Sequence, residues 1–323
     1  MDLIADSFGS NEHTLIDMAL MMERIAVQRP YFAFERRYQM PSDDWDIWGD
    51  FMPEQPLGHE VGPLAIAEAG RHLAILGSCA AALSQPAEKR TYYLAIHAIW
   101  SSAACSVTAL QRPMLSARAQ IVDCSKKRVK AHTELLLDGA IVGALQVEYQ
   151  VLSEKLFEAL FGRFRQEESA QVVDSPYKKA LELRPSSIKR HAAKAQCVEQ
   201  AEAHCAGHFP HYPMWPVAVV VYGLTRMLSF LLEKRLKRPF LFAGLQAEVH
   251  ALQLVSAHEP LTFYAGVKSM SRNGRLCRMR CVASLGEKTV AVLKITLAIE
   301  AFDESDSPLG RRNVRAKGRK KGE

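Results

Sequence analysis

The feature that most constrains this chain is an internal repeat. In each half, a proline-containing approach segment (residues 52–63 and 205–216) leads into one long apolar run, and four strand-like segments follow. The aromatic-led strands at 92–95 and 240–243 lie 148 residues apart, and the turn glycines Gly139 and Gly286 lie 147 apart. Since offsets this similar are not expected by chance, the pattern predicts a duplication.

The two apolar runs predict helices over residues 60–84 and 215–236. A helix that is apolar on nearly all sides has to be surrounded by other elements. The segments after each run alternate imperfectly between polar and apolar residues and are separated by turn residues, as in antiparallel strands. The sequence therefore predicts an α+β protein with two long central helices side by side, each wrapped by a curved antiparallel sheet, the two sheets joined edge to edge.

Composition excludes several classes of protein. A hydrophobic content of 48% with 24% charged residues is typical of a soluble globular chain. There is no uninterrupted apolar run long enough for a membrane span, and the acidic N-terminus lacks the features of a secretory signal. The seven cysteines are scattered and odd in number, which favours free thiols in a reducing cytoplasm.

Two segments resemble known families. HFPHYPMWPVAVVVYGLTRM at 208–227 resembles the β-hydroxyacyl-acyl-carrier-protein dehydratases, and GPLAIAEAGRH at 62–72 is similar to the helix of that family, including its Glu-Ala pair. PLAIAEAGRHLAILG, at 63–77, also resembles the duplicated A-factor-biosynthesis hotdog family. The resemblance implies a double hotdog, a pseudo-dimer within one chain.

The dehydratase resemblance also implies a site. In that family a His before the helix works with an acid fourteen residues later, and the two residues of one site come from opposite hotdogs. Fourteen residues after His208 stands Tyr222, and fourteen before Glu68 stands Glu54. Each half therefore keeps the member that the other half lacks. We expect His208 and Glu68 to form one complete site, and Glu54 with Tyr222 to form an inactive mirror site.

The chemistry implied is dehydration of a 3-hydroxyacyl thioester. An imidazole at His208 would take the C2 proton. A buried carboxyl at Glu68, its pKa raised by burial, would protonate the leaving hydroxyl. The amide N–H of Leu64 or Val217, at the helix starts, would stabilise the enolate oxygen. Further candidates for the pocket are His59, His211 and Tyr222.

No metal and no cofactor are expected. Cys277 and Cys281 lie four residues apart in a strand-like run, but no second pair completes a zinc site. The run that contains His204, Cys205, His208 and His211 lacks a nearby carboxylate to complete a ligand set.

Composition divides the chain into an N-terminal hotdog domain at 1–153, a helical linker at 154–172, a C-terminal hotdog domain at 173–303 and a basic tail at 304–323. The tail holds seven basic and three acidic side chains, a composition typical of disorder. It either solubilises the chain or attracts an acidic partner, an acyl carrier protein rather than a nucleic acid.

Three classes of function stay open at this point. The first is a dehydratase or isomerase that acts on thioesters of acyl carrier protein or coenzyme A, in fatty-acid or polyketide-type synthesis. The second is an acyl-transfer or condensing enzyme of the A-factor type, or a thioesterase, in which Glu68 acts as the base or orients the nucleophile and His208 matters less. The third is a non-catalytic hotdog that holds a synthase complex together. Association into a homodimer of double hotdogs is also open.

Overall fold

The computed structural model describes residues 14–39, 45–85, 90–103, 113–167, 174–197 and 202–302. Its strands are β1 (Thr14–Leu15), β2 (Phe34–Gln39), β3 (Ile47–Phe51), β4 (Thr91–Ser102), β5 (Leu115–Cys124), β6 (Arg128–Leu137), β7 (Ala140–Ser153), β8 (Leu183–Ile188), β9 (Ala192–Cys197), β10 (Phe240–Ala251), β11 (Thr262–Met270), β12 (Leu276–Leu285) and β13 (Lys288–Ala301). Its helices are α1 (Met18–Arg24), α2 (Ile66–Leu83), α3 (Glu154–Phe161) and α4 (Val217–Leu236), with short 3-10 turns at Gly162–Phe164, Pro176–Lys178 and Ala203–Cys205.

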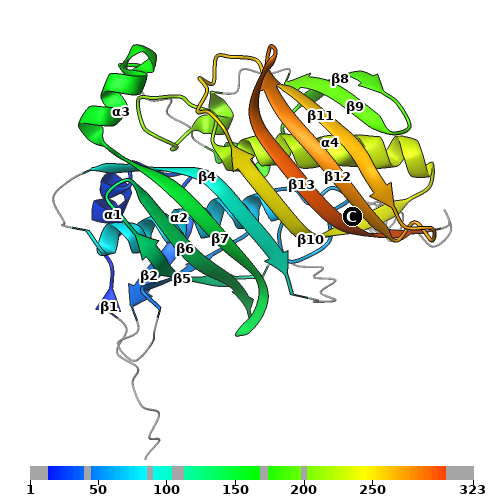
Figure 1. Cartoon of the computed structure of the whole chain (residues 1–323). Coiled ribbons are helices and arrows are strands. Elements are labelled where there is room, and N and C mark those ends of the chain that lie inside the picture. Colours follow the sequence, from blue (N-terminus) through cyan, green and yellow to red (C-terminus); the bar gives the residue numbers. More distant parts are fainter. Residues whose placement is uncertain are drawn as a thin grey trace, which may run out of the picture.

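The described strands form one sheet in the order β1-β2-β3-β5-β6-β7-β4-β10-β13-β12-β11-β9-β8 (Figure 1). Read outward from the centre, β4-β7-β6-β5 in the first half corresponds to β10-β13-β12-β11 in the second. The sheet is antiparallel throughout, and the halves meet where β4 pairs with β10. The predicted duplication, antiparallel sheets and edge-to-edge junction are confirmed.

One long helix belongs to each half of the sheet. Helix α2 packs on β5 and β6, α4 packs on β11, and the two helices touch each other. Two glycines allow the close approach of helix to sheet: a Cβ on Gly77 would lie 2.5 Å from the Tyr149 hydroxyl oxygen, and one on Gly223 would lie 2.5 Å from the Phe263 ring. Nearly every residue of α2 is buried, as its apolar sequence requires.

Two details of the predicted fold need correction. The first helix begins at Ile66 rather than at residue 60, because the chain turns at Gly62, whose φ is +141°, and Pro63 follows. Helix α2 is covered by α1 as well as by the sheet and by α4, and α1 was not predicted.

The linker prediction agrees with one helix of the structure. Helix α3 follows β7 directly, and its buried Phe157 stacks on Tyr92 with ring centroids 3.7 Å apart. The domain boundaries themselves stay a prediction, and the tail at 304–323 lies outside the described residues. Within the described part of the chain, no helix combines the length and hydropathy needed to cross a bilayer.

Candidate active site

A cavity of about 370 Å³ lies between the two helices and the strands at the junction of the halves. This volume is in the range of small-molecule sites, ~300–1,000 Å³. Its walls are mostly apolar and come from both halves: α2 and α4 on one side, and β4, β7, β10 and β13 on the other. The cavity therefore exists only because the two repeats pack together.

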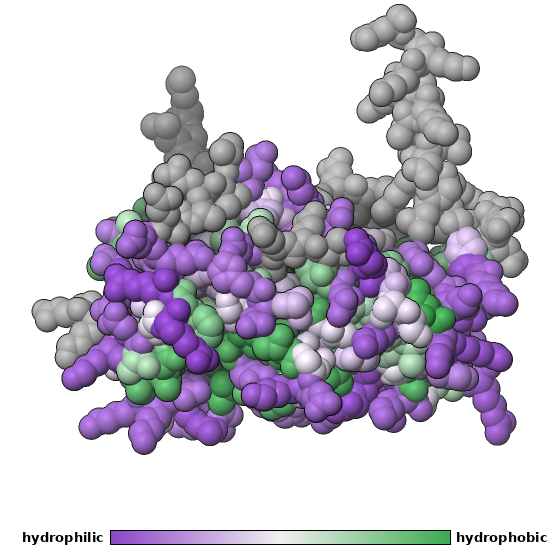
Figure 2. All heavy atoms as spheres, turned by 90° about the horizontal axis from the view of Figure 1, so that it is seen from above, coloured by the Kyte–Doolittle hydropathy of each residue, from purple (hydrophilic) through white to green (hydrophobic). Residues whose placement is uncertain are grey.

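The cavity reaches solvent beyond the end of β10. Three of its lining residues, Gln150, Leu252 and Gln253, are exposed, and Leu252 keeps 59% of its surface in solvent. Phe161 at the end of α3 lines the same region. Figure 2 shows hydrophobic residues gathered along the middle of one face, with hydrophilic residues on either side.

His208 lines this cavity and is positioned by the first half of the chain. It forms an isolated antiparallel bridge with Val27, and the Phe209 N–H donates to the Ala26 carbonyl at 3.2 Å. Gly207, with φ +82°, accepts a hydrogen bond from the Gln28 N–H at 2.7 Å. A Cβ at this position would collide with the Gln28 carbonyl, so only glycine fits.

The imidazole of His208 is neutral. Its ring packs edge-to-face on Tyr31, with centroids 5.0 Å apart, and its Nδ1 has no hydrogen-bond partner among the described residues. Burial lowers the pKa of His208 to about 3, and a backbone hydrogen bond with Met214 acts weakly in the opposite direction. The Nδ1 atom is thus buried and has no hydrogen-bond partner among the described residues.

The start of α4 opens onto the same cavity. Its N-cap is Pro216, which offers no side-chain cap, and the first turn carries no acid. The N–H groups of Val217 and Ala218 have no hydrogen-bond partner in the described part of the chain, and both residues line the cavity. Unsatisfied N–H groups at the positive end of a helix are suited to bind an oxyanion.

Glu68 lies in a different environment. Its fully buried carboxylate accepts from the N–H of Glu54 at 2.7 Å and of Gln55 at 3.1 Å. Burial alone would raise the pKa of Glu68, but His72, the Arg71 guanidinium and the Glu54 N–H outweigh it and the pKa is lowered. The expectation of a raised pKa was therefore wrong: the group is an ionised acceptor rather than a proton donor.

His208 and Glu68 are connected only indirectly. Among the described residues no hydrogen bond or ion pair joins them. The Tyr31 ring contacts His208 and also lies 5.9 Å from the Arg71 guanidinium, whose Nη2 is 3.4 Å from Glu68 Oε1. Glu68 is not part of the cavity wall, although its neighbour Ala67 is. Their roles as base and acid stay a prediction.

The two residues of the expected mirror site, Glu54 and Tyr222, both lie near Arg71. Glu54 Oε1 lies 2.7 Å from Arg71 Nη2. Arg71, Gln55 and Tyr222 border a space of about 10 Å³. Burial raises the pKa of Tyr222. This space is much smaller than the cavity between the helices, and the inactivity of this pair stays a prediction.

The other candidates from the sequence lie apart from the described cavity wall, with the exception of Val217. Leu64 is buried just before α2. His59 stacks on Phe240 with centroids 4.4 Å apart, its Nδ1 is 3.6 Å from Glu233, and burial lowers its pKa. His211 is exposed.

Sequence reasoning missed two residues, one on the cavity wall and one at the start of α2. Tyr31, which lines the cavity beside His208, comes from a loop that shows no periodic pattern. Glu60 is buried, and its Oε1 accepts from the Ile66 N–H at 2.7 Å, which caps α2. Burial raises the pKa of Glu60 to about 8. An acid six residues before a helix matches no capping pattern, so only the folded structure identifies it.

The sequence matches no protein-family model and no curated protein. Among solved structures, a TesB protein of Mycobacterium avium subspecies paratuberculosis is similar with a TM-score of 0.54 and 8% identity, over 80% of this chain and 94% of that one. A protein of unknown function with a hot dog fold from Alicyclobacillus acidocaldarius gives a TM-score of 0.51 and 11% identity, over 89% of this chain and 100% of that one.

A third structure, from Novosphingobium aromaticivorans and provisionally assigned as a thioesterase, gives a TM-score of 0.52 and 11% identity over 80% of this chain and 97% of that one. At such identities the likeness shows the fold alone, and it does not support the dehydratase resemblance. The chain has the hotdog fold, repeated in its two halves.

Proposed function

We propose that this chain hydrolyses acyl thioesters, with the acyl chain held in the cavity between the repeats. The observation that carries the proposal is that one apolar cavity is bordered both by His208, whose Nδ1 is unpartnered, and by the uncapped start of α4. His208 bonds to the backbone of Met214, three residues before Val217. The base and the N–H groups are therefore close neighbours.

In the proposed reaction a water molecule attacks the thioester carbonyl. His208 takes a proton from the water, and the N–H groups of Val217 and Ala218 bind the oxyanion. The C–S bond then breaks, the thiolate leaves and the imidazolium returns the proton to it, so the products are a carboxylic acid and a free thiol. A neutral imidazole of low pKa is a weak base, but the oxyanion that forms beside it stabilises the imidazolium.

Glu68 is proposed as a positioning residue. It binds the backbone at Glu54 and Gln55 and fixes Arg71, which packs against the ring of Tyr31. Tyr31 in turn packs against His208. Glu68 would then affect turnover through the orientation of the imidazole.

Two of the similar solved structures support the choice of reaction, since one is described as a TesB protein and another is provisionally assigned as a thioesterase. Dehydration of a 3-hydroxyacyl thioester is the second candidate. The presence of His208 on the cavity wall favours it, but an ionised Glu68 outside that wall speaks against it.

One experiment separates these reactions. The purified chain is incubated with 3-hydroxyacyl and unsubstituted acyl thioesters of coenzyme A and of acyl carrier protein, and the products are followed by thiol release and by mass. We expect free thiol and carboxylic acid from both substrate types. Loss of one water with the thioester intact would favour the dehydratase, and no reaction with any substrate would favour the non-catalytic class.

A further inference from the structure

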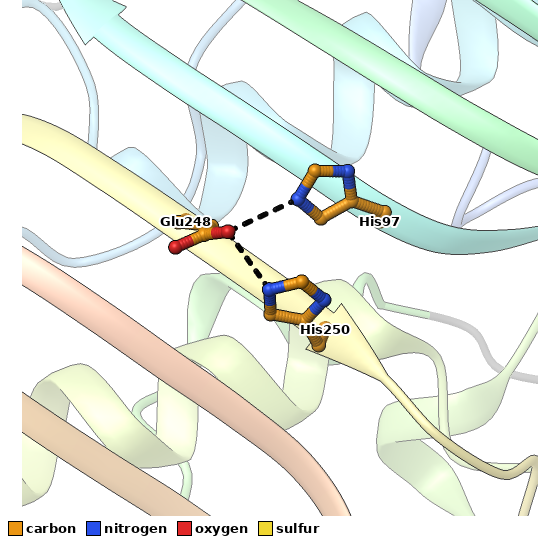
Figure 3. A group of neighbouring side chains, drawn as sticks. All are labelled: His97, Glu248 and His250. Carbon is orange, nitrogen blue, oxygen red and sulfur yellow. Dashed lines mark hydrogen bonds and ion pairs between the residues drawn. The ribbon is translucent and has the colours of Figure 1, made fainter.

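A second cluster of chemically active side chains lies where the halves of the sheet join. Strands β4 and β10 pair over five residues, from Gln246↔Ser101 to His250↔His97. His97 and His250 are direct cross-strand partners, and Glu248 lies two residues before His250, on the same face of β10. Figure 3 shows both imidazoles turned toward the Glu248 carboxylate.

The three side chains already have the spacing of a metal-ligand set. Glu248 Oε1 lies 2.8 Å from His250 Nε2 and 3.4 Å from His97 Nε2. The three ligand atoms lie within 4.8 Å of one another. Bonds of ~2.0–2.1 Å at tetrahedral angles place neighbouring ligand atoms ~3.3 Å apart. Small rotations of the side chains therefore suffice to bring all three atoms onto one ion.

The scaffold holds these side chains in place. The two imidazole rings stack with centroids 4.5 Å apart and an interplanar angle of 23°. Lys294, on β13, binds the other oxygen of Glu248 at 2.8 Å, which fixes the carboxylate and leaves Oε1 toward the imidazoles. The side chains are about one-third exposed (31%, 34% and 37% for His97, Glu248 and His250), so an ion can enter from solvent.

The charges near the three side chains do not prevent a cation from binding there. Glu148 on β7 lies opposite His97 and pairs with Arg128 at 2.5 Å. The Lys294 ammonium is the nearest positive charge, and it contacts Oε2 rather than Oε1. Metal binding would replace the hydrogen bonds that the imidazoles share with Oε1, with release of any proton at Nε2.

We propose that His97, Glu248 and His250 bind one divalent transition-metal ion, with Zn²⁺ as the best match. Two neutral imidazoles and one carboxylate form a borderline ligand set that suits Zn²⁺ and its neighbours rather than Mg²⁺ or Ca²⁺. Three protein ligands leave a position open to water. Of the three residues, His97 also borders the cavity, whereas Glu248 and His250 do not. Binding of the ion does not depend on the proposed hydrolase activity.

The position of the site suggests what the ion does. One ligand comes from the first repeat and two from the second, across the only strand pair that joins the two half-sheets in the described chain. A ligand that binds the folded state alone stabilises it. The bound ion would therefore stabilise the packing of the two repeats at the short pairing of β4 with β10.

The test uses the full-length chain after treatment with a chelator. Co²⁺ is titrated while the visible absorption is recorded, and Zn²⁺ binding is measured by calorimetry and by thermal unfolding. We expect one ion per chain, a d–d band of a four- or five-coordinate Co²⁺ site, and a rise in Tm on addition of Zn²⁺. His97→Ala, His250→Ala and Glu248→Gln should each weaken binding at least ~10-fold and remove the rise in Tm.

The matched control is His132→Ala, which removes another partly exposed histidine beside a carboxylate, Glu134, at 3.4 Å. It should leave metal binding unchanged, and Lys294→Met should retain it. The three ligand side chains are about one-third exposed, and circular dichroism checks that their variants stay folded. Failure of the parent chain to bind one equivalent, or binding that survives both histidine replacements, would overturn the proposal.

Discussion

In the two halves of this duplicated chain, the first N–H groups of the long helices α2 and α4 differ in their hydrogen-bond partners. At α2 the first N–H, that of Ile66, is bound by the buried carboxyl of Glu60. At α4 the N-cap is Pro216, and the N–H groups of Val217 and Ala218, two residues that line the cavity, have no partner in the described part of the chain. The first N–H of α2 is thus bound by the chain itself, whereas the first N–H of α4 is left open in the described part of the chain.

The acidic side chains near the two approach segments are also distributed unequally between the halves. Glu54, Glu60 and Glu68 all lie in or after the first approach segment, and their carboxylates bind the protein itself. The second approach segment and the first turn of α4 contain no acid, and they place His208 beside the open helix start. The buried acids of the first half thus bind its own groups, while in the proposed function the second half supplies His208 as the base.

Replacement of His208 tests this difference between the halves most strongly, because it should cause the largest loss of activity. His208→Ala should lower kcat/KM for a thioester substrate by at least ~100-fold, since a positioned base contributes ~10²–10⁴. His211→Ala, three residues away and exposed, is the control and should change it by less than ~2-fold. Loss of activity in the control alone would move the chemistry away from the cavity.

The buried carboxyl of Glu60 at the start of α2 should make the stability of the chain depend on pH. The pKa of Glu60 is raised from 4.5 to about 8 in the folded chain, so folding favours its protonated form. This stabilisation is complete below the unfolded pKa and is lost as the pH rises through 8. Glu60→Gln should therefore be about 2 kcal/mol less sensitive than the parent to a change from pH 6 to pH 8. Denaturant unfolding measures the difference, and parallel pH curves would refute this role of Glu60.

The pH profile of activity tests whether His208, beside the start of α4, acts as a buried neutral base. Because burial lowers the pKa of His208 to about 3, the ring stays neutral from pH 5 upward. The pH profile of kcat/KM should show no inflection near 6.5 and vary less than ~2-fold between pH 5 and 7, as this parameter reports on the free enzyme. A tenfold loss of kcat/KM per pH unit below 6.5 would mean that the imidazole is solvated, contrary to its described packing.

The smallest expected effect concerns the tail. Deletion of residues 307–323 should leave unfolding and intrinsic turnover nearly unchanged. If the tail attracts an acidic carrier protein, its deletion should weaken binding mainly at low salt, because exposed charges are screened within ~10 Å at 0.1 M. A loss of affinity that does not depend on salt would indicate a specific contact instead.

The fold was largely predictable because its signals are local. Apolar runs, alternation and turn glycines repeat with nearly constant offsets, and these patterns survive without any partner. The strands outside the repeat pattern were missed. Strand β8 reads LRPSSI, and Pro185 within it argues against a central strand. The structure places β8 at the edge of the sheet, where a missing N–H is tolerated.

The site was predictable only in part. The His-Phe-Pro pattern pointed to His208, which does line the cavity. The state of Glu68 depends on the Glu54 N–H, fourteen residues away, and on Arg71 and His72 on its own helix. Tyr31 reaches His208 from a position 177 residues earlier in the chain. Such contacts arise from packing, and no spacing rule in the sequence encodes them.

The most direct test of this account is a crystal structure with a non-hydrolysable acyl-coenzyme A thioether analogue that retains the carbonyl oxygen. The account predicts the acyl chain in the cavity between α2 and α4, and the carbonyl oxygen within ~3 Å of the N–H of Val217 or Ala218. His208 should be the nearest titratable side chain to the carbonyl carbon. A carbonyl bound at the start of α2, or an acyl chain outside the cavity, would contradict the account.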